Sequence, residues 1–293
     1  MPKAAATTVE IGGQVVRLSN LDKPLYPDGF TKGEVVHYYT SIAPMILPHL
    51  ADRPATFVRF PDGVGHESFF TKNAPRGTPE WVRTETLPAP GSGKDRSTID
   101  YVVLDSVAAL AWAANLAALE LHVPQWKVAD DGTAAPPDLI VVDLDPGPPA
   151  TIVECCQVAL IVREILGPTA VAKTSGSKGM QVYAQWDGGD SRAAMKKIAQ
   201  DLETEYPALI LSRMTKVLRE GKVLLDWSQN HTAKTTIAPY SLRGRDHPTV
   251  STPITWDEVE ACRAPEDLVF TADDVLTRVE SVGDLFAPLL RDH

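Results

Sequence analysis

The sequence predicts an α+β (mixed α/β) fold in which helices flank a central sheet. Apolar, β-branched runs that are typical of strands alternate with longer segments in which apolar residues recur at helical spacing. These segments follow no strict strand–helix–strand rhythm, so a purely parallel sheet is not expected. The length of 293 residues accommodates a sizeable core, and we expect residues 1–293 to form a single domain.

The first third of the chain is expected to begin with two short strands at 9–19, which meet at a Gly-Gly pair. Thr31 then opens the capping-box pattern TKGE, which predicts a helix that continues to residue 50. The run PATFVRF that follows has the β-branched and aromatic content of a strand. Residues 87–98, rich in Gly, Pro and Ser, are predicted to form a flexible loop.

The apolar run at 106–123 is predicted to be one long helix, buried deep in the core. Residues 138–145, DLIVVDLD, have the continuous apolar character of a buried strand. Beyond them, the hydrophobic periodicity predicts helices, strands and a helical, acidic C-terminal region. The helices are expected at 151–166 and 191–206, and the strands at 169–174, 180–186 and 222–228.

The composition bounds the class of protein. No apolar run is long enough to cross a membrane, and the N-terminus lacks a signal-peptide core. The three cysteines, Cys155, Cys156 and Cys262, have no metal-ligand or disulfide-framework spacing, which is typical of a reduced, cytoplasmic compartment. The net charge of −10 argues against nucleic acid, but residues 213–245 hold seven basic and two acidic residues, a local charge of +5. A basic surface is therefore compatible with the acidic total.

Two aspartates stand one residue apart at the end of the strand predicted at 138–145. Residues two apart on a strand share a face, so Asp143 and Asp145 are expected to point the same way. Neighbouring carboxylates repel each other unless a cation lies between them, and oxygen ligands suit Mg²⁺ or Mn²⁺. Asp226, which ends another apolar run, supplies a third carboxylate. Three carboxylates commonly bind the two metal ions that catalyse an in-line phosphoryl displacement. The alternative is that these residues cap strand ends or form turns.

The run KTSGSKGMQVY places the pentapeptide SGSKG between two predicted strands. Its glycines allow close backbone approach, its turn N–H groups can form an anion nest, and Ser175, Ser177 and Lys178 add donors and charge. These features indicate a phosphate-binding loop, although the spacing is not that of a Walker A loop. In isolation the same pentapeptide is also an acceptable hairpin turn.

Two further positions have both a structural and a functional interpretation. His122, at the end of the helix predicted at 106–123, is either a satisfied core histidine or a functional side chain. Phe69 and Phe70 are either core residues or an exposed platform on which bases stack. For a neighbouring pair on an edge strand, the core interpretation is favoured.

Seven segments together resemble one known family. They are LSNLDKPLYPDGFTKGEVVHYY, RPATFVRFPDG, FFTKNAP, ALELHVPQW, VVDLDPG, TSGSKGMQVY and VLLDWSQNHTAKTTIAPYSLRGR. In combination these motifs look like the polymerase domain of bacterial ligase D, the primase-type polymerase of non-homologous end joining within the archaeo-eukaryotic primase superfamily. The resemblance covers residues 7–285. It implies a primase-type polymerase core whose central sheet carries the catalytic aspartates, with residues 1–100 contributing a 5′-phosphate pocket and residues 101–293 forming the catalytic core.

The resemblance implies a template-dependent nucleotidyltransferase that adds nucleotides to primer 3′-ends at gaps or double-strand breaks in DNA. It further implies a preference for ribonucleotides and two divalent ions per active site, Mn²⁺ or Mg²⁺, with NTPs or dNTPs as substrates. Carried over by position, Asp143, Asp145 and Asp226 are the catalytic metal ligands. The residues implied in nucleotide binding are His122, Ser175, Lys178, Gln181, Gln229 and Arg243.

The resemblance also implies a set of DNA-binding residues, namely Lys23, Lys32, Phe69, Phe70, Lys216 and Arg219. The first two lysines belong to a pocket for the 5′-phosphate of the downstream strand, and the aromatic pair packs on the template. The loop at 87–98 and the segment at 216–222 match the two DNA-facing loops of the family. Without the resemblance, the two pocket lysines are read as solvated surface groups.

Two positions depart from the family pattern. Where the family often has histidine after the SGSKG loop, this chain has Gln181, which can hydrogen-bond a phosphate but carries no charge. Where some members have a lysine that supports the 5′-phosphate pocket, this chain has Val58. The first departure bears on binding of the triphosphate, and the second bears on recognition of the downstream end.

The partners implied by the resemblance are DNA with gaps or 3′-overhangs, the end-binding protein Ku, and a DNA ligase on the same or a separate chain. No membrane association is expected, and the implied location is the cytoplasm, at the bacterial nucleoid. Two other functions remain open at this point. The chain is alternatively a DNA end-bridging module with weak catalysis, or a primase that starts chains without a primer.

Overall fold

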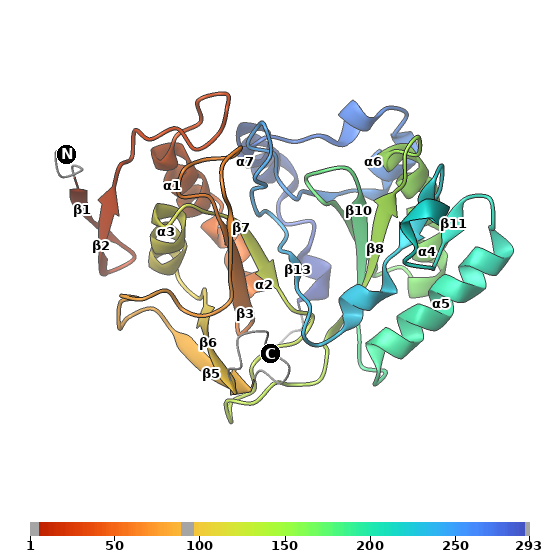
Figure 1. Cartoon of the computed structure of the whole chain (residues 1–293), viewed down its shortest axis with the longest axis horizontal. Helices are drawn as coiled ribbons and strands as arrows, with labels where there is room; N and C mark the ends of the chain where they lie inside the picture. The colour runs from red at the N-terminus through yellow and green to blue at the C-terminus, as the bar shows by residue number, and fades with distance from the viewer. Residues whose placement is uncertain (1–5, 89–96, 291–293) are drawn as a thin grey trace.

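The computed structural model describes residues 6–88 and 97–290. Their strands form two six-stranded sheets and a separate N-terminal hairpin. In Figure 1 the two sheets occupy opposite halves of the molecule, with β3, β5, β6 and β7 in one half and β8 and β10 in the other. The fold is mixed α/β, as the sequence predicts.

One sheet carries both aspartates of the DLD run, and we call it the carboxylate sheet. Its strand order is β11-β12-β8-β10-β9-β14, and its neighbouring strands are antiparallel except for the parallel pair β11 and β12. The strands are β8 (Leu139–Pro146), β9 (Val171–Thr174), β10 (Met180–Gln185), β11 (Ile210–Leu211), β12 (Val223–Leu225) and β14 (Pro253–Ile254).

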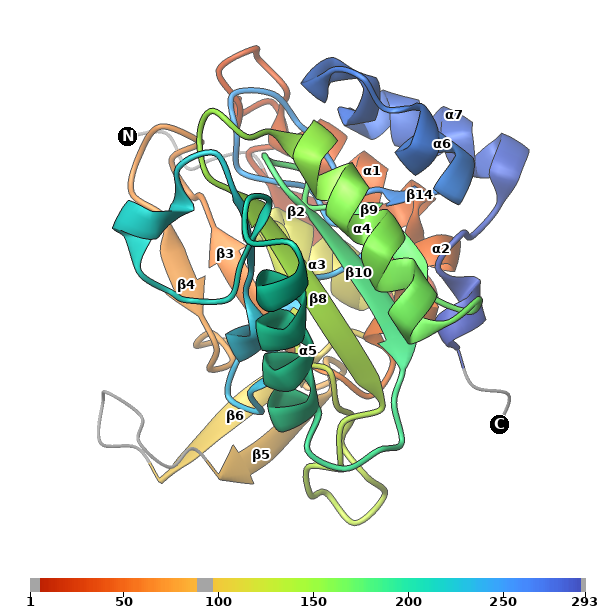
Figure 2. The ribbon, with the colours of Figure 1, turned by 90° about the vertical axis from the view of Figure 1, so that its right-hand side faces the viewer.

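Two long helices, α4 (Ile152–Leu166) and α5 (Ser191–Glu205), cover one face of the carboxylate sheet, as Figure 2 shows. Ile140, Val142 and Leu144 of β8 are buried in the cluster that includes these helices. Leu139 and Val141 belong instead to the core cluster of the N-terminal half. Because side chains alternate along a strand, Asp143 and Asp145 lie on the face opposite the two helices.

The second sheet has the order β13-β7-β3-β6-β5, and β4 pairs with β3 beside it. Its strands are β3 (Pro54–Arg59), β4 (Phe69–Thr71), β5 (Thr84–Pro88), β6 (Thr98–Val103), β7 (Ala118–Val123) and β13 (Thr236–Ile237). The core cluster of this half also takes in residues of α1 (Lys32–Ser41), α2 (Ala43–Leu50), α3 (Val107–Asn115) and α7 (Ala272–Val282). The remaining elements are β1 (Ala6–Ile11), β2 (Gln14–Ser19), α6 (Trp256–Ala261) and four 3-10 helices, η1 (Lys216–Arg219), η2 (Trp227–Asn230), η3 (Pro265–Leu268) and η4 (Ala287–Leu289).

The helix predicted at 106–123 is wrong in its second half. Helix α3 ends at Asn115, Ala117 adopts a left-handed φ of 56°, and the chain continues as strand β7. A strongly apolar run is hard to assign by periodicity, since a buried helix and a buried strand look alike. His122 therefore lies on a strand, where it alternates with buried Leu121 and Val123.

Two other boundaries differ from the sequence prediction. The capping box of Thr31 is present, but the predicted helix divides into α1 and α2 at Ile42, because Pro44 starts a new helix in its first turn. The strand predicted at 222–228 is only three residues long, and Asp226 follows its end instead of lying within it. The hairpin at 6–19, strands β3 and β8 and helices α4 and α5 agree with the prediction.

Of the loop predicted at 87–98, Leu87 and Pro88 belong instead to strand β5 and Thr98 begins strand β6, whereas residues 89–96 lie outside the described residues. All three cysteines are buried and free. Within residues 6–88 and 97–290, no helix has both the length and the apolar character that crossing a membrane requires.

Candidate active site

Asp143 and Asp145 face a cavity of about 250 Å³ at the end of β8. Their common orientation is the one that their spacing predicts. The wall of this cavity also contains all six residues that the resemblance implies for nucleotide binding, which are His122, Ser175, Lys178, Gln181, Gln229 and Arg243. The structure thus brings together side chains from β7, β8, β10, η2 and two loops that are far apart in the sequence.

The third aspartate lies beside the first two. The backbone N–H of Asp226 donates to the backbone carbonyl of Asp143 at 2.9 Å, which places the end of β12 against β8. Its carboxylate also caps η2: Oδ1 accepts from the backbone N–H of Ser228 at 3.0 Å, and Oδ2 accepts from Nε2 of Gln229 at 2.9 Å. Asp226 therefore caps the N-terminus of η2 and also lies beside Asp143.

The pKa of Asp143 reflects the proximity of the other two carboxylates. Burial raises the pKa of its carboxyl to about 6, and the charges of Asp226 and Asp145 act in the same direction. A hydrogen bond from Nε2 of Gln181, at 2.8 Å, partly offsets these effects. The charges of the two neighbouring carboxylates thus disfavour ionisation of Asp143, and a bound cation would relieve this repulsion.

Asp145 already has two cationic neighbours. Nζ of Lys178 lies 3.0 Å from Oδ1, and Nη1 of Arg219 lies 3.1 Å from Oδ2. Arg219 belongs to η1, in the segment that the resemblance implies faces DNA. The structure therefore places Arg219 at the carboxylates, and its contact with DNA stays a prediction.

The donor chemistry of the three aspartates fits a hard divalent ion, since carboxylate oxygens are the ligands that Mg²⁺ and Mn²⁺ prefer. Within the residues that the structure describes, however, no three His, Cys, Asp or Glu side chains are grouped closely enough to hold one ion. Each carboxylate instead has a protein partner: Gln181, the pair of Lys178 and Arg219, or Gln229. Coordination through Asp145 requires its two cationic partners to share or leave the carboxylate.

The SGSKG segment is a tight turn that joins β9 to β10. The backbone N–H of Ser175 donates to the carbonyl of Gly179 at 2.9 Å, and Oγ of Ser175 accepts from the N–H of Gly179 at 3.2 Å. Gly176 has a φ of 65°, and a side chain there would meet Cγ of Arg243 at 2.6 Å. The segment is thus both a hairpin turn and part of the cavity wall, with the basic side chain of Arg243 packed against it.

Glu120 holds two of the cavity residues. Its carboxylate lies 2.9 Å from Nε2 of His122 and 3.3 Å from Nε of Arg243, and it accepts from the N–H of Gly244 at 3.1 Å. Although burial acts to raise it, the hydrogen bond with His122 and the charge of Arg243 lower the pKa of Glu120 to about 2. His122 is therefore not a free ligand but a hydrogen-bonded partner of Glu120, and burial lowers the pKa of its imidazole.

The two lysines of the predicted phosphate pocket meet a third cation. Burial lowers the pKa of Lys32 to about 8, and the charges of Lys23 and Arg59 act in the same direction. Lys23 also pairs with Asp62, with Nζ and Oδ1 2.9 Å apart. Lys32 begins helix α1 and is only 7% exposed, so it is not the solvated surface lysine of the alternative interpretation.

The core interpretation of the aromatic pair is wrong. Phe69 and Phe70 on β4 are 44% and 61% exposed, and Nζ of Lys72 lies 5.9 Å from the ring centre of Phe70. The short β4 is paired only with β3, so it leaves both rings on the surface. Lys216, in η1, is also exposed.

Three charged residues of these clusters escaped the sequence reasoning. They are Arg59 beside the pocket lysines, Glu120 between His122 and Arg243, and Lys173, which is fully buried and donates to Gln181. Each lies within a strand that is otherwise largely apolar. A charged side chain inside such a strand needs a buried partner, and this requirement could have identified all three.

A mixed sheet that presents aspartates beside a glycine-rich turn and basic side chains defines a class of protein, the primase-type polymerases, which are nucleotidyltransferases. The chain belongs to the family of the LigD primase-polymerase domain, whose family model matches residues 31–286.

Relatives and a solved structure agree with this assignment. The chain is 46% identical over 286 residues to the multifunctional non-homologous end joining protein LigD of Mycolicibacterium smegmatis, and this match covers 94% of the chain and 36% of the relative. It is 31% identical to the bifunctional non-homologous end joining protein LigD of Bacillus subtilis, over 94% of the chain and 44% of the relative. The polymerase domain from Mycobacterium tuberculosis ligase D, solved in complex with DNA, superimposes with a TM-score of 0.86 at 42% identity, over 94% of this chain and 97% of that one.

These comparisons confirm the resemblance, the mixed α/β fold and the assignment to the polymerases. The chain spans less than half the length of the two relatives. Divalent-metal dependence follows from the family, whereas the identity of the metal does not.

Proposed function

We propose that this chain adds nucleotides, with a preference for ribonucleotides, to primer 3′-ends across a template, at gaps or broken ends of DNA during non-homologous end joining. The observation that carries the proposal is the cavity in which Asp143 and Asp145 face Lys178 and Arg243. Negative groups for metal ions and positive groups for a triphosphate then line one site, where Lys178 and Asp145 are direct neighbours. The names of the relatives, which are end-joining proteins, support the same reaction.

In this proposal Asp143, Asp145 and Asp226 hold two divalent ions, Mn²⁺ or Mg²⁺. Bound divalent ions would lower the pKa of the attacking hydroxyl and stabilise the negative charge that develops on the phosphate. The chain itself positions these residues: β8 carries Asp143 and Asp145 on one face, and the pairing of β12 with β8 brings Asp226 beside Asp143. No protein nucleophile is needed, because the primer 3′-OH attacks the α-phosphate and pyrophosphate leaves.

The remaining cavity residues bind the nucleotide. Lys178 and Arg243 offset the charge of the triphosphate, and Ser175, Gln181 and Gln229 add hydrogen bonds. Glu120 keeps His122 and Arg243 in place at the base of the site. A ribose preference requires a group that tolerates or contacts the 2′-OH.

DNA binds across the N-terminal part in this proposal. The cluster of Lys23, Lys32 and Arg59 takes the 5′-phosphate of the downstream strand, with Arg59 supplying the charge that Val58 lacks. Phe69 and Phe70 stack on the template. Lys216 and Arg219 contact DNA from η1, so Arg219 exchanges its partner Asp145 for DNA.

The partners and location follow from the reaction. We propose Ku and a DNA ligase as partners, since end joining needs end recognition and sealing, and the bacterial cytoplasm as the location.

One extension assay on a gapped duplex tests the function. We expect labelled nucleotides to be incorporated only with a divalent ion and a template, more with rNTP than with dNTP, and more with a 5′-phosphate than with a 5′-hydroxyl across the gap. Asp226→Asn, which keeps an oxygen for the η2 cap, is the matched inactive control. DNA binding without any incorporation would favour an end-bridging module, and incorporation without a primer on single-stranded template would favour a primase.

A further inference from the structure

A row of three polar side chains crosses the centre of the carboxylate sheet. In the strand register, Gln181 of β10 stands opposite Asp143 of β8 on one side and opposite Lys173 of β9 on the other. Residues that stand opposite each other on neighbouring strands place their side chains on the same face. Gln181 thus lies between Lys173 and Asp143 and hydrogen-bonds to both, and the charge of Lys173 also acts on Asp143.

Lys173 is fully buried and makes specific contacts. Its Nζ donates to Oε1 of Gln181 at 2.6 Å and to Oγ of Ser251 at 2.7 Å, and it lies 5.6 Å from the ring centre of Tyr183. Burial and the charge of Arg243 hold the pKa of Lys173 well below its usual range. A lysine nitrogen carries N–H donors in both protonation states, so the contact with Gln181 does not depend on its charge.

These contacts determine which way the Gln181 amide faces. Lys173 donates to the carbonyl oxygen, and the hydroxyl of Tyr183 donates to the same oxygen at 3.2 Å. The amide is planar, so its NH₂ group must point away from both donors. On that side Nε2 donates to Oδ1 of Asp143 at 2.8 Å.

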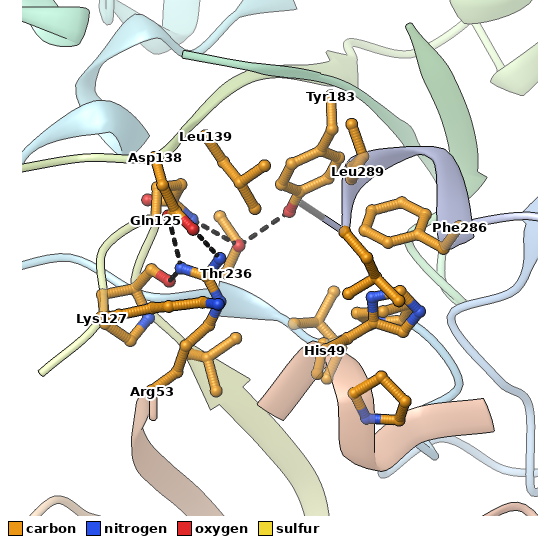
Figure 3. Close-up of a pocket in the computed structure, with 17 residues that line it drawn as sticks. His49, Arg53, Gln125, Lys127, Asp138, Leu139, Tyr183, Thr236, Phe286 and Leu289 are labelled. Atoms are coloured by element: carbon orange, nitrogen blue, oxygen red, sulfur yellow. Dashed lines mark hydrogen bonds and ion pairs between the residues drawn. The ribbon is translucent and has the colours of Figure 1, made fainter. Parts of the chain in front are cut away.

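The Tyr183 hydroxyl has a second hydrogen-bond partner, the hydroxyl of Thr236. Nε2 of Gln125 donates to Oγ1 of Thr236 at 2.8 Å, and this oxygen lies 2.8 Å from the Tyr183 hydroxyl. Figure 3 shows this chain at the edge of a small cavity of about 30 Å³. Since the Tyr183 hydrogen is directed to Gln181, Thr236 must donate to Tyr183, and every donor in the chain points towards Asp143. Hydrogen bonds that run in one direction polarise and strengthen one another.

We infer that Lys173 is a positioning residue of the polymerase site, which with Tyr183 fixes the Gln181 amide so that an N–H donor, and not an oxygen, faces Asp143. The inference rests on the proposed function, in which Asp143 is a metal ligand. A reversed amide would set a carbonyl oxygen against a carboxylate oxygen, and the two would repel. Loss of groups that orient a metal ligand typically lowers metal affinity or activity by about 10- to 100-fold.

The first test observes Gln181 directly, in protein without metal, nucleotide or DNA. Lys173→Met keeps an unbranched side chain, one atom shorter, and removes its donors. The two side-chain N–H resonances of Gln181, assigned by their loss in Gln181→Ala, should move towards the positions of a free amide in Lys173→Met. Their exchange with water should also become faster, because the amide is no longer held.

The second test measures binding of Mn²⁺ to the DNA-free protein from the electron paramagnetic resonance of the free ion. Lys173→Met should bind Mn²⁺ about tenfold more weakly, with a similar loss in Gln181→Ala. The double variant should be no weaker than Gln181→Ala alone, because the two residues act through one contact. Losses that add in the double variant would show that Lys173 acts independently of Gln181, which contradicts the inference.

Ser251→Ala is the matched control, since it removes the other acceptor of Lys173 without touching Gln181. It should lower the thermal midpoint and leave the Gln181 resonances near their wild-type positions.

If Lys173→Met does not fold, Tyr183→Phe removes only the second donor to the amide and should give a smaller shift in the same direction. Unchanged Gln181 resonances in a folded Lys173→Met or Tyr183→Phe protein overturn the inference. Absence of primer extension by the wild type would instead contradict the proposed function and leave the resonance result standing.

Discussion

The guanidinium of Arg219 donates to the carboxylate of Asp145 across a distance of 3.1 Å, although 74 residues separate the two in the sequence. Lys178 approaches the other carboxylate oxygen at 3.0 Å, so both oxygens of Asp145 have cationic partners. A divalent ion and these side chains therefore compete for the same carboxylate. Arg219 in η1 and Lys178 in the turn between β9 and β10 both lie outside the strands, so either side chain can leave the carboxylate without disturbing the sheet.

The first prediction concerns the three carboxylates. Asp143→Asn, Asp145→Asn and Asp226→Asn should each lower primer extension by at least about a hundredfold, because each removes charge that stabilises the transition state. Binding to gapped DNA should persist, since removal of negative charge does not weaken attraction to phosphate. Extension assays and equilibrium binding on the same preparations measure both effects. If one variant extends the primer at the wild-type rate, the residue it replaces is not a catalytic metal ligand.

The second prediction concerns competition at Asp145. In protein without DNA, Arg219→Ala should tighten Mn²⁺ binding by up to about fivefold, because a partly exposed ion pair contributes about 0.2–1 kcal/mol. Titration with Mn²⁺ measures the change. Arg213→Ala is the matched control, since Arg213 lies in the same segment but pairs with Glu203. An equal effect of both variants would attribute the change to overall charge and not to Asp145.

The third prediction concerns the cluster of Lys23, Lys32 and Arg59. Wild-type protein should bind gapped DNA with a 5′-phosphate more tightly than the same DNA with a 5′-hydroxyl. Lys32→Ala and Arg59→Ala should each reduce this preference by about tenfold, the value of a hydrogen bond between charged groups. Lys23→Ala should have a smaller effect, because Lys23 already pairs with Asp62. Because each variant is compared with itself on the two DNAs, a loss of protein stability affects both affinities equally. Equal binding of both DNAs by the wild type would show that the protein has no 5′-phosphate pocket.

The fourth prediction is a pH dependence of that preference. The pKa of Lys32 is about 8, and a lysine loses its positive charge as the pH rises through its pKa. A terminal phosphate has a second pKa of about 6, so its own charge is constant over the range tested. The preference for 5′-phosphate should therefore decline between pH 7 and pH 9, with a midpoint at or above 8, since bound phosphate raises the pKa of the lysine. Lys32→Ala should abolish the dependence, and its survival in that variant would assign the titration to another group.

The fifth prediction concerns the exposed aromatic pair. Phe70→Ala should weaken binding to gapped DNA by at least about fivefold, because stacking of a base on an aromatic ring contributes about 1–3 kcal/mol. The thermal midpoint should hardly change, since Phe70 is 61% exposed. Val15→Ala, at another exposed apolar position, should leave DNA binding unchanged. A large fall in stability without loss of binding would mean that Phe70 serves the fold.

Local patterns were enough for several features of this protein. The capping box at Thr31 and the common face of Asp143 and Asp145 depend on residues within four positions of each other, and both are present. The apolar run at 106–123 could not be divided in the same way, because its strand half becomes visible only when β7 pairs with β3. Exposure of Phe69 and Phe70 likewise depends on β4 having no second neighbour.

The sequence by itself determined the family, the mixed α/β fold and the common face of Asp143 and Asp145, because motifs and short-range periodicity carry that information, and the family resemblance named six residues of the cavity wall. Only the tertiary structure decided which charged groups meet. Arg219 at Asp145, Glu120 at Arg243 and Lys173 behind Gln181 are contacts set by strand register and loop packing. Electrostatic and hydrogen-bond energies fall steeply with distance, so a partner must be placed within a few ångströms before its effect exists at all.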